Sequence, residues 1–314
     1  MKLADAIQEY IDHKRALGMV FKSNTVRLRA FLHQLGNVEL ESITREQVRA
    51  FLEGVPGPVT RFWFVKHSAL SGFFRYAINH DYLKSSPLPT ALPQAPTPFS
   101  AYIYSVEDMR RLLDAADSRH RFVWLLEPHT VRCLLLPLYG TGLRIGEAVR
   151  LTISDVDLCE RILTVRETKF FKTRLVPFGS HLAWVLEAYY ARQWAGKNQT
   201  SDSPFLCTHT GKGITIQTAE LVFKRLRAEA GIVRPEGTRY QPRLHDFRHT
   251  FAVTRLVTWY REGKNVQRLL PHLSTYLGHV RIAETSRYLA LTKELLQEAS
   301  RCFELYALPE VNHD

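Results

Sequence analysis

A small set of side chains in this sequence could do chemistry on a phosphate. The set comprises two arginines, a lysine, two histidines and a tyrosine: Arg144, Lys169, His245, Arg248, His279 and Tyr288. A guanidinium can donate two parallel hydrogen bonds to the non-bridging oxygens of one phosphate. A tyrosine hydroxyl can act as a nucleophile when its high pKa is overcome, and a lysine or histidine can protonate a leaving alkoxide. Together these side chains allow phosphoryl transfer without a metal ion.

Each segment that carries these residues also has an ordinary structural explanation. The glycines around Arg144 are typical of a turn between two helices, and the cation-rich segment 164–177 is typical of an exposed edge hairpin. Tyr288, taken alone, is typical of a tyrosine in a core. His245 and Arg248 are three residues apart, so on a helix both would face the same anion. Only the combination of the segments favours phosphoryl transfer.

A zinc hydrolase is an alternative for the same region. His245 and His249 have the i, i+4 spacing of a zinc-binding pair, but no Glu follows His245 as in H-E-x-x-H, and Arg248 would repel the cation. The cysteines are scattered and form no C-x-x-C pair: Cys133, Cys159, Cys207 and Cys302. We therefore expect no metal and no other cofactor.

Composition narrows the class of protein further. The 314 residues include 42 Lys+Arg and 31 Asp+Glu, a formal net charge of +11, which favours a polyanionic partner such as nucleic acid. Asp5 and Glu9 interrupt the N-terminal segment where a signal peptide needs an apolar run, and nothing approaches the ~18 apolar residues of a membrane span. We expect a cytoplasmic, nucleoid-associated protein with no membrane partner.

The first part of the chain has only helical patterns. Apolar residues recur at helical spacing in 3–17, 25–35 and 60–79, and Thr44 followed by Gln47 is typical of a helix N-terminus. Five prolines between residues 87 and 98 then predict an extended linker. The domain boundaries that follow are 1–86 for a helical domain, 87–100 for the linker and 101–314 for a second domain.

The second domain has mixed patterns. Three short alternating segments predict a small antiparallel sheet: Leu151–Val156, Ile162–Val165 and Arg174–Pro177. Helical patterns cover the rest: 105–113, 128–139, 180–194, 215–230, 245–261, 264–277, 281–289 and an amphipathic C-terminal helix at 292–306. The predicted fold class is mainly α with a small antiparallel β-sheet, in two domains.

Three motifs resemble those of the tyrosine recombinases, the family of phage integrases and Xer-type recombinases. GTGLRIGEAVRL resembles the first arginine box, HDFRHTFA the H-x-x-R box, and LGHVRIAETSRYL the final box. The order Arg, Lys, His-x-x-Arg, His, Tyr is also that of the family. The resemblance covers about residues 101–300 and implies an α+β catalytic domain, whereas the N-terminal helices resemble the family's core-binding (SAM-like) domain only in architecture.

The resemblance implies a role for each matching residue. Arg144 and Arg248 would clamp the scissile phosphate, His245 would assist proton transfer, and His279 would hydrogen-bond the phosphate. Tyr288 would attack and form a 3′-phosphotyrosyl link without metal or ATP.

The resemblance also implies roles for two lysines and a glutamate. Lys169 would protonate the departing 5′ oxygen, and Lys172 matches a second basic position. Glu147 would orient Arg144. Two features depart from the family pattern: Lys169 lacks a flanking glycine, and Leu289 and Ala290 follow Tyr288 where relatives often have a histidine.

The function implied by the resemblance is site-specific DNA recombination, in integration or transposition. The implied partners are double-stranded DNA with specific recombination sites and further copies of this chain, as a dimer on each site and a tetramer in synapsis. Helix 292–306 would dock into a neighbouring subunit, and related recombinases or accessory DNA-bending proteins are further partners. A type IB topoisomerase and a non-catalytic DNA-binding regulator on the same scaffold are the alternatives.

Overall fold

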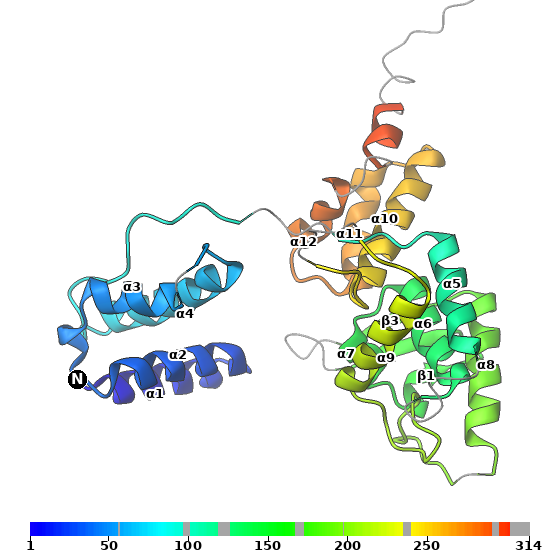
Figure 1. Ribbon diagram of the computed structural model, residues 1–314, viewed down its shortest axis with the longest axis horizontal. Helices are drawn as coiled ribbons and strands as arrows, with labels where there is room; N and C mark the ends of the chain where they lie inside the picture. Colours follow the sequence, from blue (N-terminus) through cyan, green and yellow to red (C-terminus); the bar gives the residue numbers. More distant parts are fainter. Residues whose placement is uncertain are drawn as a thin grey trace, which may run out of the picture. The chain divides into compact units, whose positions relative to one another are not determined.

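The protein folds into two compact units in the computed structural model, Met1–Phe99 and Ser100–Asp314 (Figure 1). The structure describes residues 1–55, 57–96, 101–118, 126–166, 173–196, 198–234, 240–290 and 295–301. The predicted fold class, mainly helical with one small antiparallel sheet, is confirmed.

The first unit is built from helices around an aromatic core. Its elements are α1 (Leu3–Ala16), α2 (Lys22–Leu35), the 3-10 helix η1 (Leu40–Ser42), α3 (Arg45–Glu53) and α4 (Arg61–Asn79). The Thr44 hydroxyl accepts the Gln47 N–H and the Gln47 side chain accepts the Thr44 N–H, so the predicted start of α3 is a capping box. Phe31 packs edge-on against Phe51 at 5.0 Å between ring centroids. Burial of such rings on the inner face of each helix holds the unit together.

The second unit combines helices with a three-stranded sheet. Its helices are α5 (Val106–Asp117), α6 (Pro128–Thr141), α7 (Ile145–Ala148), α8 (Ser180–Trp194), α9 (Ile216–Glu229), α10 (Asp246–Arg261), α11 (Val266–Leu277) and α12 (Ile282–Ser286). The 3-10 helices are η2 (Ile153–Asp155) and η3 (Arg287–Ala290), and residues 295–301 are also helical. The strands β1 (Val156–Asp157), β2 (Ile162–Val165) and β3 (Arg174–Pro177) pair antiparallel in the order β1-β2-β3, with Leu163 opposite Val176.

The predicted strand at Leu151–Val156 is wrong for most of its length. Asp155 accepts hydrogen bonds from both the backbone N–H and the hydroxyl of Thr152, at 3.1 and 2.9 Å, and this box caps the N-terminus of the 3-10 helix η2. Pairing with β2 therefore begins only at Val156, and Thr152 forms an isolated antiparallel bridge with Pro204 instead. Short polar side chains that bond the nearby backbone compete with strand pairing, and here they win.

Helix α6 is the buried centre of the second unit, because Leu134, Leu135 and Leu138 are each at most 1% exposed. It packs against α8 on one side and α10 on another. A separate apolar cluster joins α10, α11 and η3. Helices α10, α11 and α12 lie side by side (Figure 1). The ends of α6 and α11 therefore meet the start of α10, which is where the candidate site lies.

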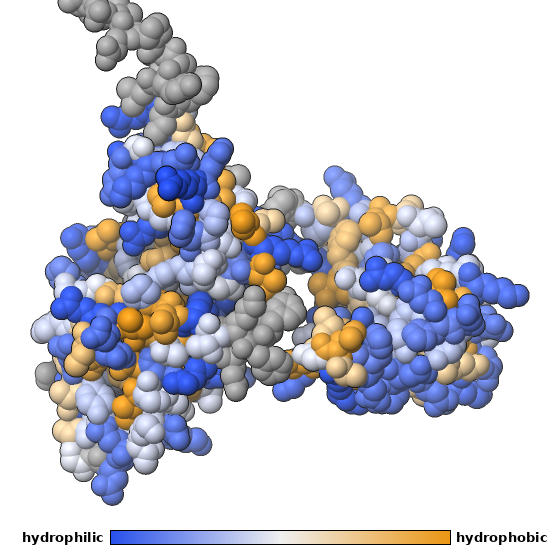
Figure 2. Space-filling model, turned by 180° about the vertical axis from the view of Figure 1, so that it is seen from behind, coloured by the Kyte–Doolittle hydropathy of each residue, from blue (hydrophilic) through white to orange (hydrophobic). Residues whose placement is uncertain are grey.

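The surface is largely hydrophilic on the face drawn in Figure 2, with hydrophobic residues in separate patches. Within the described ranges, no helix combines the length and the apolar character needed to cross a bilayer.

Candidate active site

Two left-handed glycines end the helices that meet at the site. Gly142 follows α6 with φ 65°, and a Cβ there would lie 2.7 Å from Cδ1 of Phe251. Gly278 follows α11 with φ 68°, and a Cβ there would lie 2.8 Å from Nη1 of Arg174. Both positions thus need glycine for conformation and for space. These two turns direct the last carbonyls of α6 and α11 toward α10.

Arg248 is buried among those carbonyls. Its side chain belongs to the first turn of α10 and the residue is 1% exposed. Nη1 donates to the Gly142 carbonyl at 2.9 Å and Nη2 to the Leu277 carbonyl at 2.5 Å. Burial, followed by the charge of Arg144, lowers the pKa of Arg248 to about 10, so it stays protonated at neutral pH. A guanidinium has five N–H groups, and these carbonyls take two. The remaining donors can serve a phosphate.

Arg144 lies at the start of α7 and is bound by a carboxylate. Its Nη1 donates to Glu147 Oε1 at 2.8 Å, its backbone N–H donates to Glu147 Oε2 at 2.9 Å, and Nη2 contacts the Gly278 carbonyl at 3.4 Å. Its side chain is 35% exposed, whereas that of Glu147 is 4% exposed. Glu147 therefore holds Arg144 from the buried side and leaves its outer edge open to a ligand.

Arg174 shares the same carboxylate. From β3 it donates Nη1 and Nη2 to the two oxygens of Glu147 at 3.1 and 2.8 Å, and Nε to the Tyr276 carbonyl at 2.9 Å. No sequence motif above includes Arg174 among the candidate site residues. A signal was available, since Arg174 is two residues from the fully buried Val176 and so points to the same face of β3.

Glu147 is ionised in this arrangement. Burial opposes its charge, but hydrogen bonds and charges from Arg174 and Arg144 outweigh burial and lower the pKa of Glu147 to about 2. One buried carboxylate thus orients two guanidiniums without cancelling both charges.

His279 follows the glycine turn after α11. Its Nδ1 lies 2.7 Å from the hydroxyl of the fully buried Thr285 on α12. Burial, then the charges of Arg248 and Arg144, lower the pKa of His279 to about 3. The ring is therefore neutral at neutral pH, and its orientation is fixed from behind by Thr285.

His245 caps the start of α10. Part of the residue reaches solvent, yet loss of water around the ring, then His249 and Arg248, lower the pKa of His245 to about 4. Its ring is edge-on to that of His249 at 5.0 Å. A neutral imidazole in this place can accept a proton at neutral pH.

Tyr288 lies in η3 and is 4% exposed. Its ring is near-parallel to His279 at 6.0 Å and edge-on to His249 at 5.5 Å. Burial raises the pKa of Tyr288, while the charge and hydrogen bonding of Arg248 act against this rise. The structure thus brings Tyr288 together with Arg248 and His279. It also brings Arg144 together with Glu147.

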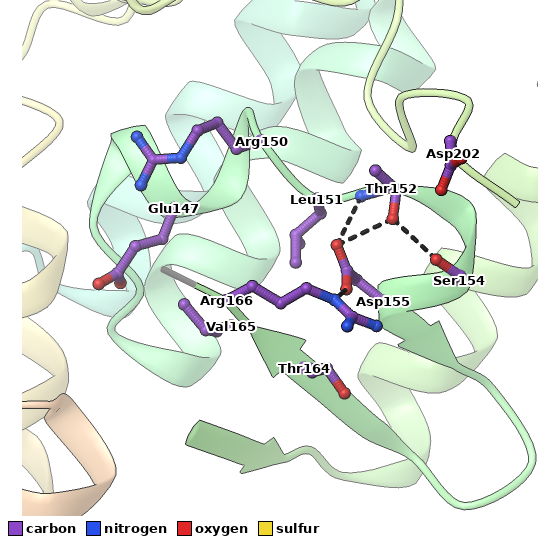
Figure 3. A pocket seen from close by; sticks show the side chains of 10 residues that line it. All are labelled: Glu147, Arg150, Leu151, Thr152, Ser154, Asp155, Thr164, Val165, Arg166 and Asp202. Carbon is purple, nitrogen blue, oxygen red and sulfur yellow. Dashed lines mark hydrogen bonds and ion pairs between the residues drawn. The ribbon is translucent and has the colours of Figure 1, made fainter. Parts of the chain in front are cut away.

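Lys169 and Lys172 lie outside the described residues. Beside the described base of their hairpin is a cavity of about 360 Å³ lined by Glu147, Arg150 and Asp155, among others (Figure 3). Asp155 accepts a hydrogen bond from Nε of Arg166, whereas the Glu147 carboxylate points away from that pair (Figure 3). Among the described residues, no group of three or more His, Cys, Asp or Glu side chains is arranged to hold a metal ion.

Comparison with known proteins adds independent information. The sequence model of the phage integrase family matches residues 104–294. Over 302 residues, 95% of this chain and 96% of the relative, the sequence is 36% identical to y4rB of Sinorhizobium fredii, which is described as an integrase/recombinase. It is 28% identical to the tyrosine recombinase XerC of Oceanobacillus iheyensis, over 86% of this chain and 83% of XerC.

The fold is also similar to that of a solved structure. The Tn1549 transposon integrase in complex with transposon right end DNA matches with a TM-score of 0.69 and 18% identity, over 98% of this chain and 100% of that chain. At this identity the likeness concerns the fold.

Proposed function

The chain belongs to the phage integrase family and is a tyrosine recombinase, an enzyme that breaks and rejoins DNA strands, and we propose that Tyr288 is its nucleophile. One observation carries this proposal: Tyr288 is buried next to Arg248, in contact with His279, where two arginines can hold a phosphate.

The scissile phosphate would bind between Arg144 and Arg248. Arg248 offers N–H groups beyond the two that bind the carbonyls of Gly142 and Leu277, and Arg144 offers its exposed edge. His279, neutral and held by Thr285, would donate one hydrogen bond to the same phosphate. Charges fixed in advance stabilise a pentacovalent transition state better than groups that must reorganise.

Cleavage then proceeds by exchange of one phosphodiester for another. The Tyr288 oxygen forms a bond to phosphorus and its proton passes to His245, while the bond to the 5′ oxygen breaks. We assign the proton for that oxygen to Lys169. The product is a 3′-phosphotyrosyl link and a free 5′ hydroxyl. Rejoining reverses each step, and because the number of phosphodiester bonds is unchanged, no ATP is needed.

Burial of Tyr288 has a use in this scheme. Its raised pKa keeps the phenol protonated in the free enzyme. The nucleophile therefore gains reactivity only as the phosphate arrives and the proton leaves, which limits attack on other groups.

The net charge of +11 supports binding of both units to duplex DNA. The helical unit 1–86 would be the core DNA-binding domain. We propose that the protein acts in the cytoplasm at the nucleoid, as a dimer on each recombination site and a tetramer in synapsis. Helix 292–306 would dock into a neighbouring subunit. Related recombinases and accessory DNA-bending proteins are the further partners that we propose.

The decisive experiment is covalent trapping on a suicide DNA substrate that loses its 5′ hydroxyl fragment after cleavage. We expect the wild type to form a protein–DNA adduct, Tyr288→Phe to form none, and the control Tyr190→Phe, at a half-buried tyrosine of α8, to match the wild type. An adduct with Tyr288→Phe would overturn the assignment. Relaxation of a plasmid without recombination sites would favour the topoisomerase alternative, and binding without any adduct would favour the regulator.

A further inference from the structure

One side chain next to the nucleophile has no place in the scheme above. His249 follows Arg248 on the first turn of α10, and within the described chain its buried Nδ1 has no hydrogen-bond partner. Leaving a buried polar atom without a partner costs about 1–3 kcal/mol. A leucine or phenylalanine would fill the space without that cost, so hydrogen bonding does not explain the choice of histidine here.

The ring contacts of His249 point to Tyr288. The two rings meet edge to face, with centroids 5.5 Å apart and an angle of 64° between their planes. The Tyr288 ring has a second contact with His279, where the ring centroids are 6.0 Å apart and the angle between the ring planes is 23°. The ring of the nucleophile therefore touches two imidazoles that come from different helical ends.

The helix places His249 for this contact. His245 and His249 are one turn apart on α10, and their rings meet at 5.0 Å and 88°. Arg248 lies between them in sequence and is fixed by two carbonyls. Since α10 also packs against η3, a change at His249 would move Tyr288 relative to a guanidinium that cannot follow it.

We propose that His249 is a positioning residue for Tyr288, whose ring contact holds the phenol hydroxyl beside Arg248 for in-line attack. His249 acts through Tyr288 and does not touch the phosphate or the leaving oxygen. Burial also lowers the pKa of His249, so the ring is neutral and adds no cation beside Arg248. This inference rests on the proposed function of Tyr288.

The test compares three variants in single-turnover cleavage of the suicide substrate. We expect His249→Ala and His249→Asn to cleave about 10- to 100-fold more slowly, because a displacement of about 1 Å has an effect of this size. His249→Phe keeps the edge-to-face ring and should stay within about threefold of the wild type. DNA affinity should be unchanged in all three, and His272→Ala, an exposed histidine on α11, is the matched control.

A second substrate separates the nucleophile from the leaving group. With sulfur in place of the bridging 5′ oxygen, departure needs no proton, so a defect in leaving-group protonation would vanish. We expect the His249→Ala defect to persist at the same size on this substrate. Recovery there, wild-type cleavage by His249→Ala, or a His249→Phe rate as low as that of His249→Ala would each overturn the proposal. Cleavage by Tyr288→Phe in the same assay would instead overturn the proposed function.

Discussion

Two arginines of the site are held in opposite ways. Arg248 is buried and bound by the neutral carbonyls of Gly142 and Leu277, at the C-terminal ends of two helices. Arg144 is partly exposed and bound by the ionised Glu147, which also binds Arg174. Helix ends stabilise a cation by their dipoles without a countercharge, whereas a carboxylate orients a cation and removes part of its field. The α10 side of the site thus supplies charge, and the α7–β3 side supplies orientation.

The largest effect is expected from removing the buried charge. Arg248→Ala should lower single-turnover cleavage by about 10³-fold or more, because it removes a preorganised donor and leaves two carbonyls without a partner. Arg255→Ala, an exposed arginine on the same helix, is the control and should cleave normally. If both variants cleave at the same rate, Arg248 does not supply the charge.

Glu147→Gln tests the orienting carboxylate by its effect on stability against pH. The pKa of Glu147 is about 2 when folded, against an ordinary value of 4.5. Its ionisation therefore stabilises the fold by about 3 kcal/mol above pH 4.5, and this contribution is lost as the pH falls from 4.5 toward 2. Urea unfolding should show a gap between wild type and variant at pH 6 that falls to less than half of that size at pH 3. Glu220→Gln on the exposed face of α9 should leave the pH dependence unchanged, and an equal gap at both pH values would contradict the assigned charge of Glu147.

Arg174 should have a smaller effect that acts through its neighbours. Arg174→Ala removes two bonds to Glu147 and the bond to the Tyr276 carbonyl, so Arg144 loses its alignment. We expect cleavage to fall about tenfold with little change in DNA affinity. Arg174→Lys keeps the charge but not the fork, and it should recover part of the loss. Full activity of Arg174→Ala would show that Glu147 aligns Arg144 alone.

The smallest effect concerns protons taken up on binding. Burial, and after it nearby positive charges that include Arg248, lower the pKa values of His279 and His245 to about 3 and about 4. A bound phosphate offsets those cations and raises both pKa values, so binding should take up a fraction of a proton at pH 5.5 and none at pH 8. Calorimetry in buffers of different ionisation enthalpy measures this uptake. Proton release at pH 5.5 would mean that the phosphate binds away from α10.

The sequence predicted the positions of most helices and a common site for the motif residues. Helical periodicity located α4 and α6 within a few residues, and the spacing of Arg144, Arg248 and Tyr288 in three motifs indicated a common site. The strand expected at Leu151–Val156 does not form over most of its length, because Asp155 binds the backbone N–H and the hydroxyl of Thr152. An alternating pattern of apolar and polar residues does not reveal such local hydrogen bonds.

The roles of Arg174 and His249 were not predicted, for a different reason. Arg174 stands in a segment crowded with cations, and its role depends on β3 packing against α11. His249 depends on where η3 lies against α10. Contacts between elements far apart in sequence are set by packing, so periodicity and motif spacing do not reveal them.

The two carbonyls that hold Arg248 lie 106 and 29 residues from it in the chain. Synthesis proceeds from the N-terminus, so the ribosome releases the Gly142 segment well before Leu277, and Tyr288 later still. Until both helix ends have docked, the guanidinium lacks its anchor. A truncated copy that ends before Leu277 therefore lacks one anchor of Arg248 as well as Tyr288. The site is complete only when three segments that leave the ribosome at different times have packed against one another.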